Sequence, residues 1–167
     1  MGVVHLARDE RMGRLVALKV LPPGGREGMA ERFRREIMAV ARLRHPGIVP
    51  VFDVGAEDGS PYFAKEYVDG VTLQERLDDL RERDLGPEHL VGDGVPDAVR
   101  STCLLVAQLA DALHHAHEQG VIHRDVKPGN VLLDGGRPRL FDFGLARVVD
   151  EQTMTQVGDI AGTPSYV

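Results

Sequence analysis

Two short polar stretches constrain the fold of this chain more than any other feature: His-Arg-Asp-Val-Lys-Pro-Gly-Asn at 123–130 and Asp-Phe-Gly at 142–144. Short apolar runs flank both stretches, and the sequence Asp-Gly-Gly-Arg-Pro at 134–138 is typical of a turn. We therefore expect residues 131–133 and 139–141 to pair as a β-hairpin. The stretch at 123–130 is then an exposed loop on a rigid frame, which is where catalytic groups commonly lie.

The polar residues of these stretches suit phosphoryl transfer, which needs positioning, metal ions and a group that accepts a hydroxyl proton. Asp125 is the candidate base, and Lys127 can neutralise charge on the transferred group. Asn130 and Asp142 supply oxygen atoms, the ligands that Mg²⁺ prefers. The structural alternative is that both aspartates are ordinary turn residues and that His123 is a packed core histidine. Each residue alone favours that alternative, whereas the whole set in this order favours the chemistry.

The two stretches resemble the catalytic loop and the metal-binding motif of protein kinases. The pattern Asp-x-Lys-Pro-x-Asn at 125–130 resembles the serine/threonine branch, and the chain is similar in style to bacterial kinases of the eukaryotic-like type. The resemblance implies transfer of the γ-phosphate of ATP to serine or threonine hydroxyls of proteins, with ATP and Mg²⁺ as cofactors. It assigns Asp125 as the base, Lys127 to the transferred phosphoryl group, and Asn130 and Asp142 to the metal.

The resemblance also implies the fold class, an α+β protein with two lobes. Residues 1–68 would form the N-lobe, an antiparallel sheet with one helix, and residues 69–167 a partial, mainly helical C-lobe that ends in the activation segment. We expect the domain to be incomplete at both ends. Only Gly2 and Val4 match the end of the glycine-rich loop, and no Ala-Pro-Glu motif follows residue 162.

The hydrophobic pattern and the turn residues predict the secondary structure of both lobes. A capping box, Thr72 with Glu75, opens the second helix. The expected strands are 3–8, 14–21, 48–54 and 61–68, the expected helices 29–43, 72–83 and 97–118, and the expected loop 86–96.

Two charged residues of the N-lobe gain a role only from the resemblance. Lys19 lies in the alternating sequence Val-Ala-Leu-Lys-Val at 16–20 and would hold the α- and β-phosphates. Glu36, next to the apolar stripe of the helix expected at 29–43, would be its ionic partner. Taken singly, a lysine on a strand and a glutamate on a helix are more commonly solvated surface charges.

The resemblance assigns the remaining nucleotide contacts to both lobes. Val4, Ala17 and Leu132 would sandwich adenine, and the backbone of the hinge at Glu66 and Val68 would form hydrogen bonds with it.

Lys65, just before the hinge, departs from the family pattern, which has an apolar or small polar residue there. This lysine would either crowd the nucleotide pocket or compete with Lys19 for Glu36, and the sequence leaves both readings open.

The segment after Gly144 resembles an activation segment, and Gly162-Thr163-Pro164-Ser165-Tyr166 resembles the stretch that shapes the substrate site. Thr153 and Thr155 lie where kinases are phosphorylated, and Arg124 is placed to pair with a phosphothreonine. We hypothesise that two copies associate for autophosphorylation at either threonine. The alternative is two threonines in an ordinary loop.

Composition narrows the class of protein. A chain of 167 residues can form a sizeable core, and its formal net charge of −6 argues against nucleic acid or an anionic membrane as the main partner. We find no signal peptide and no apolar run of transmembrane length, so we expect a cytoplasmic protein. The single cysteine, Cys103, opens an apolar helical pattern, and we expect it to be buried.

Three alternatives stay open at this point. The first is a pseudokinase or regulatory nucleotide-binding module, favoured by the missing glycines and by Lys65. The second is a small-molecule kinase on a similar fold. Lys127 and the stretch at 162–164 favour protein substrates instead. The third is a fragment without independent function.

Overall fold

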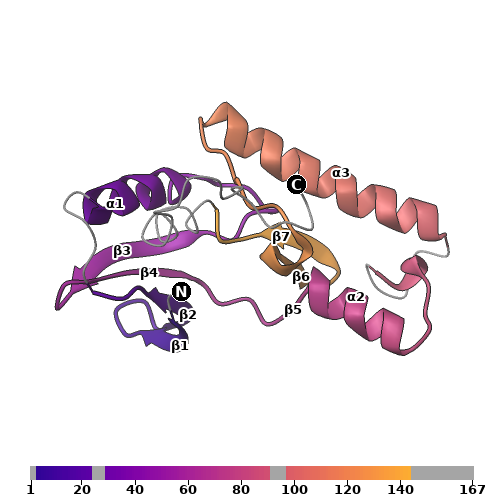
Figure 1. Ribbon diagram of the computed structural model, residues 1–167, viewed down its shortest axis with the longest axis horizontal. Coiled ribbons are helices and arrows are strands. Elements are labelled where there is room, and N and C mark those ends of the chain that lie inside the picture. The colour runs from indigo at the N-terminus through magenta and orange to yellow at the C-terminus, as the bar shows by residue number, and fades with distance from the viewer. Residues whose placement is uncertain (1–2, 24–28, 91–96, 144–167) are drawn as a thin grey trace, which may run out of the picture. The chain divides into compact units, whose positions relative to one another are not determined.

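The computed structural model describes residues 3–23, 29–90 and 97–143 (Figure 1). These residues form two compact units, which we describe separately. His45–Val49 and Val68–Asp142 belong to the second unit, and the other described residues belong to the first.

The first unit is a four-stranded antiparallel sheet with one helix, as the sequence predicted. The strand order is β1-β2-β4-β3. Its elements are β1 (Val3–Asp9), β2 (Arg14–Val20), α1 (Met29–Val40), β3 (Val51–Glu57) and β4 (Ser60–Glu66). A tight turn at Asp58 and Gly59, with φ angles of 49° and 74°, joins β3 to β4. This turn is shorter than the predicted break because both of its residues adopt the left-handed conformation that closes a two-residue hairpin.

Helix α1 packs its apolar stripe into the core of the first unit. Phe33, Ile37 and Val40 are buried, and the ring of Phe33 lies 6.1 Å from that of Phe63 on β4. The helix ends at Val40, three residues earlier than expected. The chain continues from there as a tighter turn, in which the N–H of Leu43 donates to the carbonyl of Val40.

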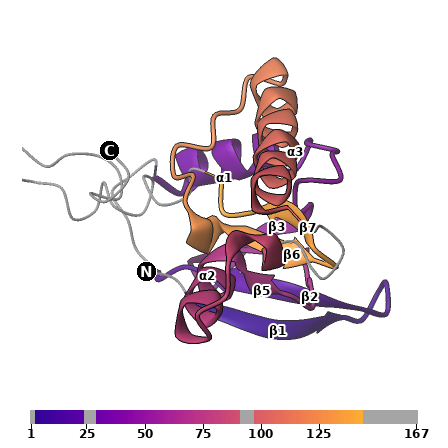
Figure 2. The same cartoon turned by 90° about the vertical axis from the view of Figure 1, so that its right-hand side faces the viewer.

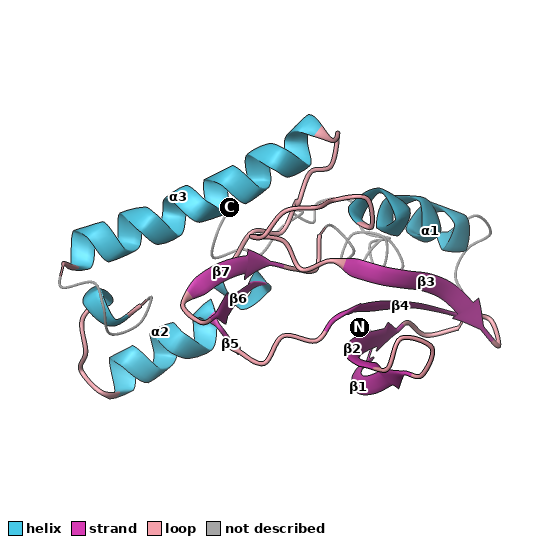
Figure 3. Ribbon diagram, turned by 180° about the vertical axis from the view of Figure 1, so that it is seen from behind, coloured by secondary structure: helices cyan, strands magenta, loops and turns pink. Residues whose placement is uncertain are grey.

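The second unit combines two α-helices with a small sheet of strand order β5-β6-β7. Its elements are β5 (Val71–Thr72), α2 (Leu73–Glu82), the 3₁₀ turn η1 (Pro87–His89), α3 (Ala98–Glu118), the 3₁₀ turn η2 (Pro128–Asn130), β6 (Val131–Asp134) and β7 (Arg137–Leu140). Helix α3 packs against β7 (Figures 2 and 3). Strand β5 had no signal in the sequence. The turn η1 lies within the loop expected at 86–96. Residues 91–96 of that loop are outside the described part.

The hairpin of β6 and β7 confirms the predicted strand pairing but has a shorter turn. Gly135 and Gly136, with φ angles of 56° and 81°, form the whole connection, and Asp134 is paired with Arg137. Strand β7 therefore begins at Arg137, two residues before the predicted start.

The strand predicted at 48–54 is wrong at its first three residues. Ile48 forms a parallel bridge with Leu140 in the second unit instead of joining the four-stranded sheet. The N–H of Leu140 donates to the carbonyl of Gly47 at 2.8 Å, and the N–H of Val49 donates to the carbonyl of Leu140 at 2.9 Å. Pro50 separates this short pairing from β3, because proline has no N–H to continue a ladder.

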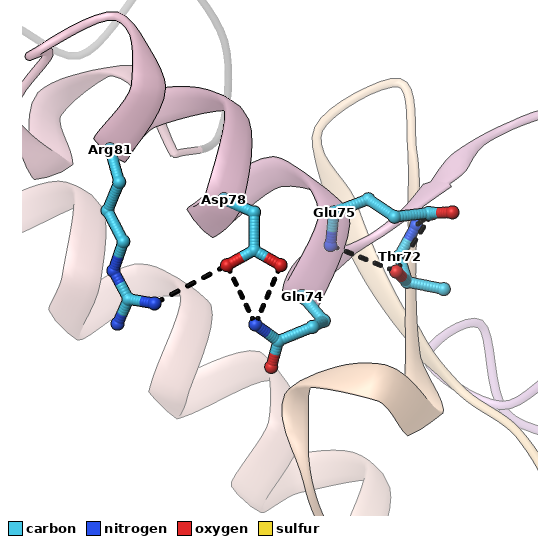
Figure 4. A network of polar contacts seen from close by, with 5 residues as sticks. All are labelled: Thr72, Gln74, Glu75, Asp78 and Arg81. Atoms are coloured by element: carbon cyan, nitrogen blue, oxygen red, sulfur yellow. Dashed lines mark hydrogen bonds and ion pairs between the residues drawn. The ribbon is translucent and has the colours of Figure 1, made fainter.

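The capping box of α2 is confirmed (Figure 4). The N–H of Glu75 donates to the Thr72 hydroxyl at 3.1 Å, and the N–H of Thr72 donates to the Glu75 carboxylate at 2.7 Å. The hydrogen bonds that the Thr72 backbone N–H and then the Thr72 hydroxyl donate to the carboxylate lower the pKa of Glu75. One turn further on, the side chains of Gln74 and Arg81 both donate to Asp78.

Helix α3 is capped by Asp97 and ends just before Gly120, whose φ is 72°. It buries Leu105, Ala112 and Ala116. The expectation that Cys103 is buried is wrong, because this residue lies on the exposed side of the helix.

Candidate active site

His123 anchors the loop that carries the predicted catalytic groups. Its side chain is only 1% exposed, its Nε2 lies 3.0 Å from the carbonyl oxygen of Phe141, and the N–H of Asp125 donates to its Nδ1 at 3.3 Å. Burial lowers the pKa of His123, so the ring is neutral at physiological pH. A neutral ring with the proton on Nε2 satisfies both contacts. The loop is thereby tied to the segment that leads into Asp142.

Asp125, Lys127 and Asn130 converge at the centre of the loop. Oδ2 of Asp125 lies 2.8 Å from Nζ of Lys127 and accepts a hydrogen bond from Nδ2 of Asn130 at 2.9 Å. Nδ2 of Asn130 also donates to the backbone carbonyl of Asp125 at 2.8 Å. The side chains of Asp125 and Lys127 are 18% and 31% exposed. The structure thus places a half-buried carboxylate, a cation and an amide in mutual contact, a geometry that fixes the carboxylate.

The oxygen donors of this loop fit a hard divalent cation. Since Nδ2 of Asn130 is directed at Asp125, its amide oxygen is directed away from Asp125. Asp142 contributes a half-buried carboxylate. No cluster of three or more histidine, cysteine or acidic side chains that could hold a metal occurs among the described residues. A cation held by Asn130 and Asp142 would therefore take further oxygens from water or phosphate, as Mg²⁺ commonly does.

Two residues at the loop adopt a left-handed backbone conformation that is uncommon for non-glycine residues. The φ angle is 64° at Arg124 and 57° at Asp142. Such conformations cost on the order of 1–3 kcal/mol and cluster at functional sites. Arg124 is the residue before the candidate base, and Asp142 is the candidate metal ligand.

The first unit carries Val4, Ala17 and Lys19 on one face of its sheet. Val4 lies opposite Lys19 in the ladder of β1 and β2, and Ala17 follows the same alternation two residues before Lys19. Nζ of Lys19 lies 5.9 Å from the ring centre of Phe63, on the side of the sheet where Phe33 of α1 packs.

Glu36 and Glu66 lie elsewhere in the first unit. Glu36 is half-buried on α1, between the buried residues Phe33 and Ile37. The N–H of Glu66 donates to the carbonyl of Pro50 at 3.0 Å. Because this N–H is already used, an adenine bound here would form its hydrogen bond with the backbone carbonyl oxygen of Glu66.

The other two predicted adenine contacts lie in the second unit. Val68 is half-buried before β5, and Leu132 is half-buried on β6, opposite Thr72. The predicted Gly2, Gly144, Thr153, Thr155 and the stretch at 162–166 are outside the described residues.

The geometry agrees with comparisons to known proteins. All 167 residues match the model of the protein kinase domain. The chain belongs to the protein kinase family. Among curated kinases it is 39% identical over 173 residues to the probable serine/threonine-protein kinase pknA2 of Bifidobacterium longum. It is 40% identical over 169 residues to the DNA damage-responsive serine/threonine-protein kinase RqkA of Deinococcus radiodurans.

Solved kinase structures support the same fold. The kinase domain of Mycobacterium tuberculosis PknI is similar with a TM-score of 0.69 and 35% identity, over 87% of this chain and 54% of that chain. The curated kinases are much longer: the match covers 100% of this chain but 21% of pknA2, and 98% but 23% of RqkA. In the part of the chain that the structure describes, no helix has both the length and the apolar character to span a membrane.

Two features of the described residues had no usable signal in the sequence. The tether from His123 to Phe141 joins residues 18 positions apart and depends on how the hairpin folds back. The burial of Lys65, 7% exposed on β4, depends on the strands and the helix around it.

Proposed function

We propose that the complete protein is a serine/threonine protein kinase that transfers the γ-phosphate of ATP to protein hydroxyls. The observation that carries this proposal is the contact set of Asp125 with Lys127 and Asn130, at 2.8 and 2.9 Å. In this reaction the substrate hydroxyl attacks the γ-phosphorus, the bond to ADP breaks, and Asp125 accepts the hydroxyl proton. Lys127 stabilises the transferred group, and its pairing with Asp125 keeps that carboxylate oriented.

We assign the nucleotide contacts residue by residue from the kinase pattern, with the lobes divided at 68/69. Lys19, paired with Glu36, binds the α- and β-phosphates. Val4, Ala17 and Leu132 sandwich the adenine, and the backbone at Glu66 and Val68 forms hydrogen bonds with it.

Asn130 and Asp142 would hold Mg²⁺, which neutralises phosphate charge when it is bound. Their side-chain oxygens are the donor type that this cation prefers.

The decisive experiment measures transfer of labelled phosphate from ATP to a generic basic protein, with the full-length protein as enzyme. Asp125→Asn keeps the size of the side chain but removes its basicity. We expect this variant to lose at least about 10²-fold in kcat. Arg81→Gln, an exposed change on α2, is the matched control and should leave kcat unchanged.

The other outcomes identify the alternatives. If neither the wild type nor Asp125→Asn transfers phosphate above background, the protein is a pseudokinase. If the wild type transfers phosphate to aminoglycosides in preference to the basic protein, it is a small-molecule kinase.

We further propose that two copies associate for autophosphorylation at Thr153 or Thr155. Mass spectrometry after incubation of the full-length protein with Mg-ATP should find phosphate on at least one of these threonines. Absence from both in an active preparation contradicts this part of the proposal. The cytoplasmic location expected from the sequence remains a prediction.

A further inference from the structure

Lys65 is the one lysine or arginine that is buried among the described residues, with 7% of its surface exposed. It lies on β4, directly before Glu66. Neither the catalytic loop nor the phosphate contact of Lys19 uses this side chain. A cation at such a position is retained only when anionic or dipolar groups compensate for its loss of water.

The sheet register places Lys65 beside the proposed phosphate-binding lysine. Lys65 is opposite Ala17 of β2, and Lys19 is opposite Phe63. Opposite residues share a face, and so do residues two apart on a strand. All four side chains therefore belong to one face, on which Lys19 and Lys65 are diagonal neighbours.

Helix α1 lies over this face of the first unit (Figure 3). Its Phe33 approaches Phe63 to 6.1 Å, and Nζ of Lys19 lies 5.9 Å from the same Phe63 ring. Val51 of β3, the other ladder partner of Lys65, is buried. The ammonium groups of Lys19 and Lys65 thus belong to one apolar layer between sheet and helix.

The described part of α1 contributes one half-buried acid to this layer. Glu36 lies between Phe33 and Ile37, both of which are buried. The only other acid there, Glu31, is 63% exposed and lies 4.0 Å from Arg34. The sheet thus contributes two cations to this layer, and the described part of the helix contributes one half-buried carboxylate. In a layer of low dielectric each cation strongly affects how the other is paired.

We propose that Lys65 is a positioning residue that shares Glu36 with Lys19 and so weakens the hold of Glu36 on the phosphate-binding lysine. This inference rests on the proposed function for its consequence, because Lys19 is the group that meets ATP. Lys65 itself does not contact the reacting atoms. Removing its charge leaves Glu36 to Lys19 alone and orders Lys19 for nucleotide binding.

The test is a double-mutant cycle in the full-length protein with Lys65→Met, Glu36→Gln and both together. Methionine keeps nearly the length of the apolar lysine stem and removes the charged ammonium group. We expect Lys65→Met to lower the KM for ATP by about threefold to tenfold, with kcat changed by less than about twofold. In the Glu36→Gln background the same change should alter KM by less than about 1.5-fold. Arg34→Met, which removes an exposed cation from the same helix, is the matched control and should leave KM unchanged.

A second readout needs no catalysis. Glu36→Gln leaves two cations, the buried Lys65 and the half-buried Lys19, in the wild-type background but only Lys19 in the Lys65→Met background. Its effect on the thermal midpoint without nucleotide should therefore be at least about twice as large in the wild type.

Equal shifts in both backgrounds, in KM and in midpoint, would overturn the proposal and show that Lys65 acts through its volume. Wild-type protein that transfers no phosphate would refute the proposed function. The midpoint cycle would still decide whether Lys65 and Glu36 are coupled.

Discussion

His123 illustrates how a single buried side chain sets the geometry of a loop that carries candidate catalytic groups. Its two ring nitrogens contact the backbone N–H of Asp125 and the carbonyl of Phe141, next to Asp142. Both contacts require the neutral ring with the proton on Nε2. Protonation of Nδ1 would place its N–H against the N–H of Asp125, and this repulsion between two donors would disrupt the loop at 123–130.

This requirement predicts a pH dependence of stability. Burial lowers the pKa of His123 below its unfolded value of about 6.5. Below that value the unfolded chain binds a proton that the native ring does not, so stability is complete above about pH 6.5 and falls as the pH decreases. The slope contributed by this one residue is at most about 1.4 kcal/mol per pH unit.

Urea denaturation of the full-length protein at pH 7.5, 6.5 and 5.5, with His123→Asn as a non-titrating comparison, measures this slope. We expect the wild type to lose more stability than the variant between pH 6.5 and 5.5. Parallel curves would contradict the assignment of the neutral ring.

At the scale of elements, local signals fix where the helices begin. The capping box of α2 satisfies two backbone N–H groups within four residues of sequence, so it needs no long-range contact. We expect Thr72→Ala to destabilise the protein by about 1 kcal/mol, and Thr72→Ser to retain nearly all of the stability. Chemical denaturation of the three proteins measures the difference, and an alanine variant as stable as the serine variant would show that the cap contributes nothing.

The carboxyl group of Glu75 makes the stability of the same cap depend on pH. Because the pKa of Glu75 is lowered, its contribution is complete above the usual carboxyl pKa of about 4.5 and is lost as the pH falls further. The stability difference between wild type and Glu75→Gln should therefore shrink between about pH 5 and pH 3.

The turn of the β6–β7 hairpin gives a second test at this scale. Gly135 has a φ of 56°, and no heavy atom lies within 4 Å of the position that an alanine Cβ would take, so an added methyl group meets only backbone strain. We expect Gly135→Ala to cost about 1 kcal/mol. Gly129 also has open space around its Cβ position but no positive φ, so Gly129→Ala is the matched control for stability. Equal stability of the two variants would contradict the left-handed turn.

At the scale of the whole molecule, α3 presents apolar side chains on the side opposite its buried stripe. Val99 and Val106 are 70% and 55% exposed, and Cys103 lies on the same side. Exposed apolar surface of this kind promotes association. We expect residues 1–167, expressed alone, to self-associate, and Val106→Lys to reduce light scattering at equal concentration.

Gln108→Lys adds the same charge at an exposed polar position of α3 and is the matched control. An equal reduction by both variants would show that net charge, rather than the apolar face, controls association.

The sequence alone determined the parts of this protein that depend on neighbours a few residues apart. The position of the loop at 123–130, the cap of α2 and the three helices were predictable because the turn residues, capping bonds and apolar spacing that mark them are local. The motifs of the loop also indicated the kinase family, since their residue types and spacing are specific.

Only the tertiary structure decided which segments cover one another. Gly47 and Val49 pair with Leu140 rather than with the sheet that follows them, Lys65 is buried, and Cys103 is exposed. A periodic pattern shows that a face is apolar or polar, but it does not show which distant element packs on that face. Burial and strand pairing are set by contacts between residues far apart in sequence, and these contacts form only when the chain has folded.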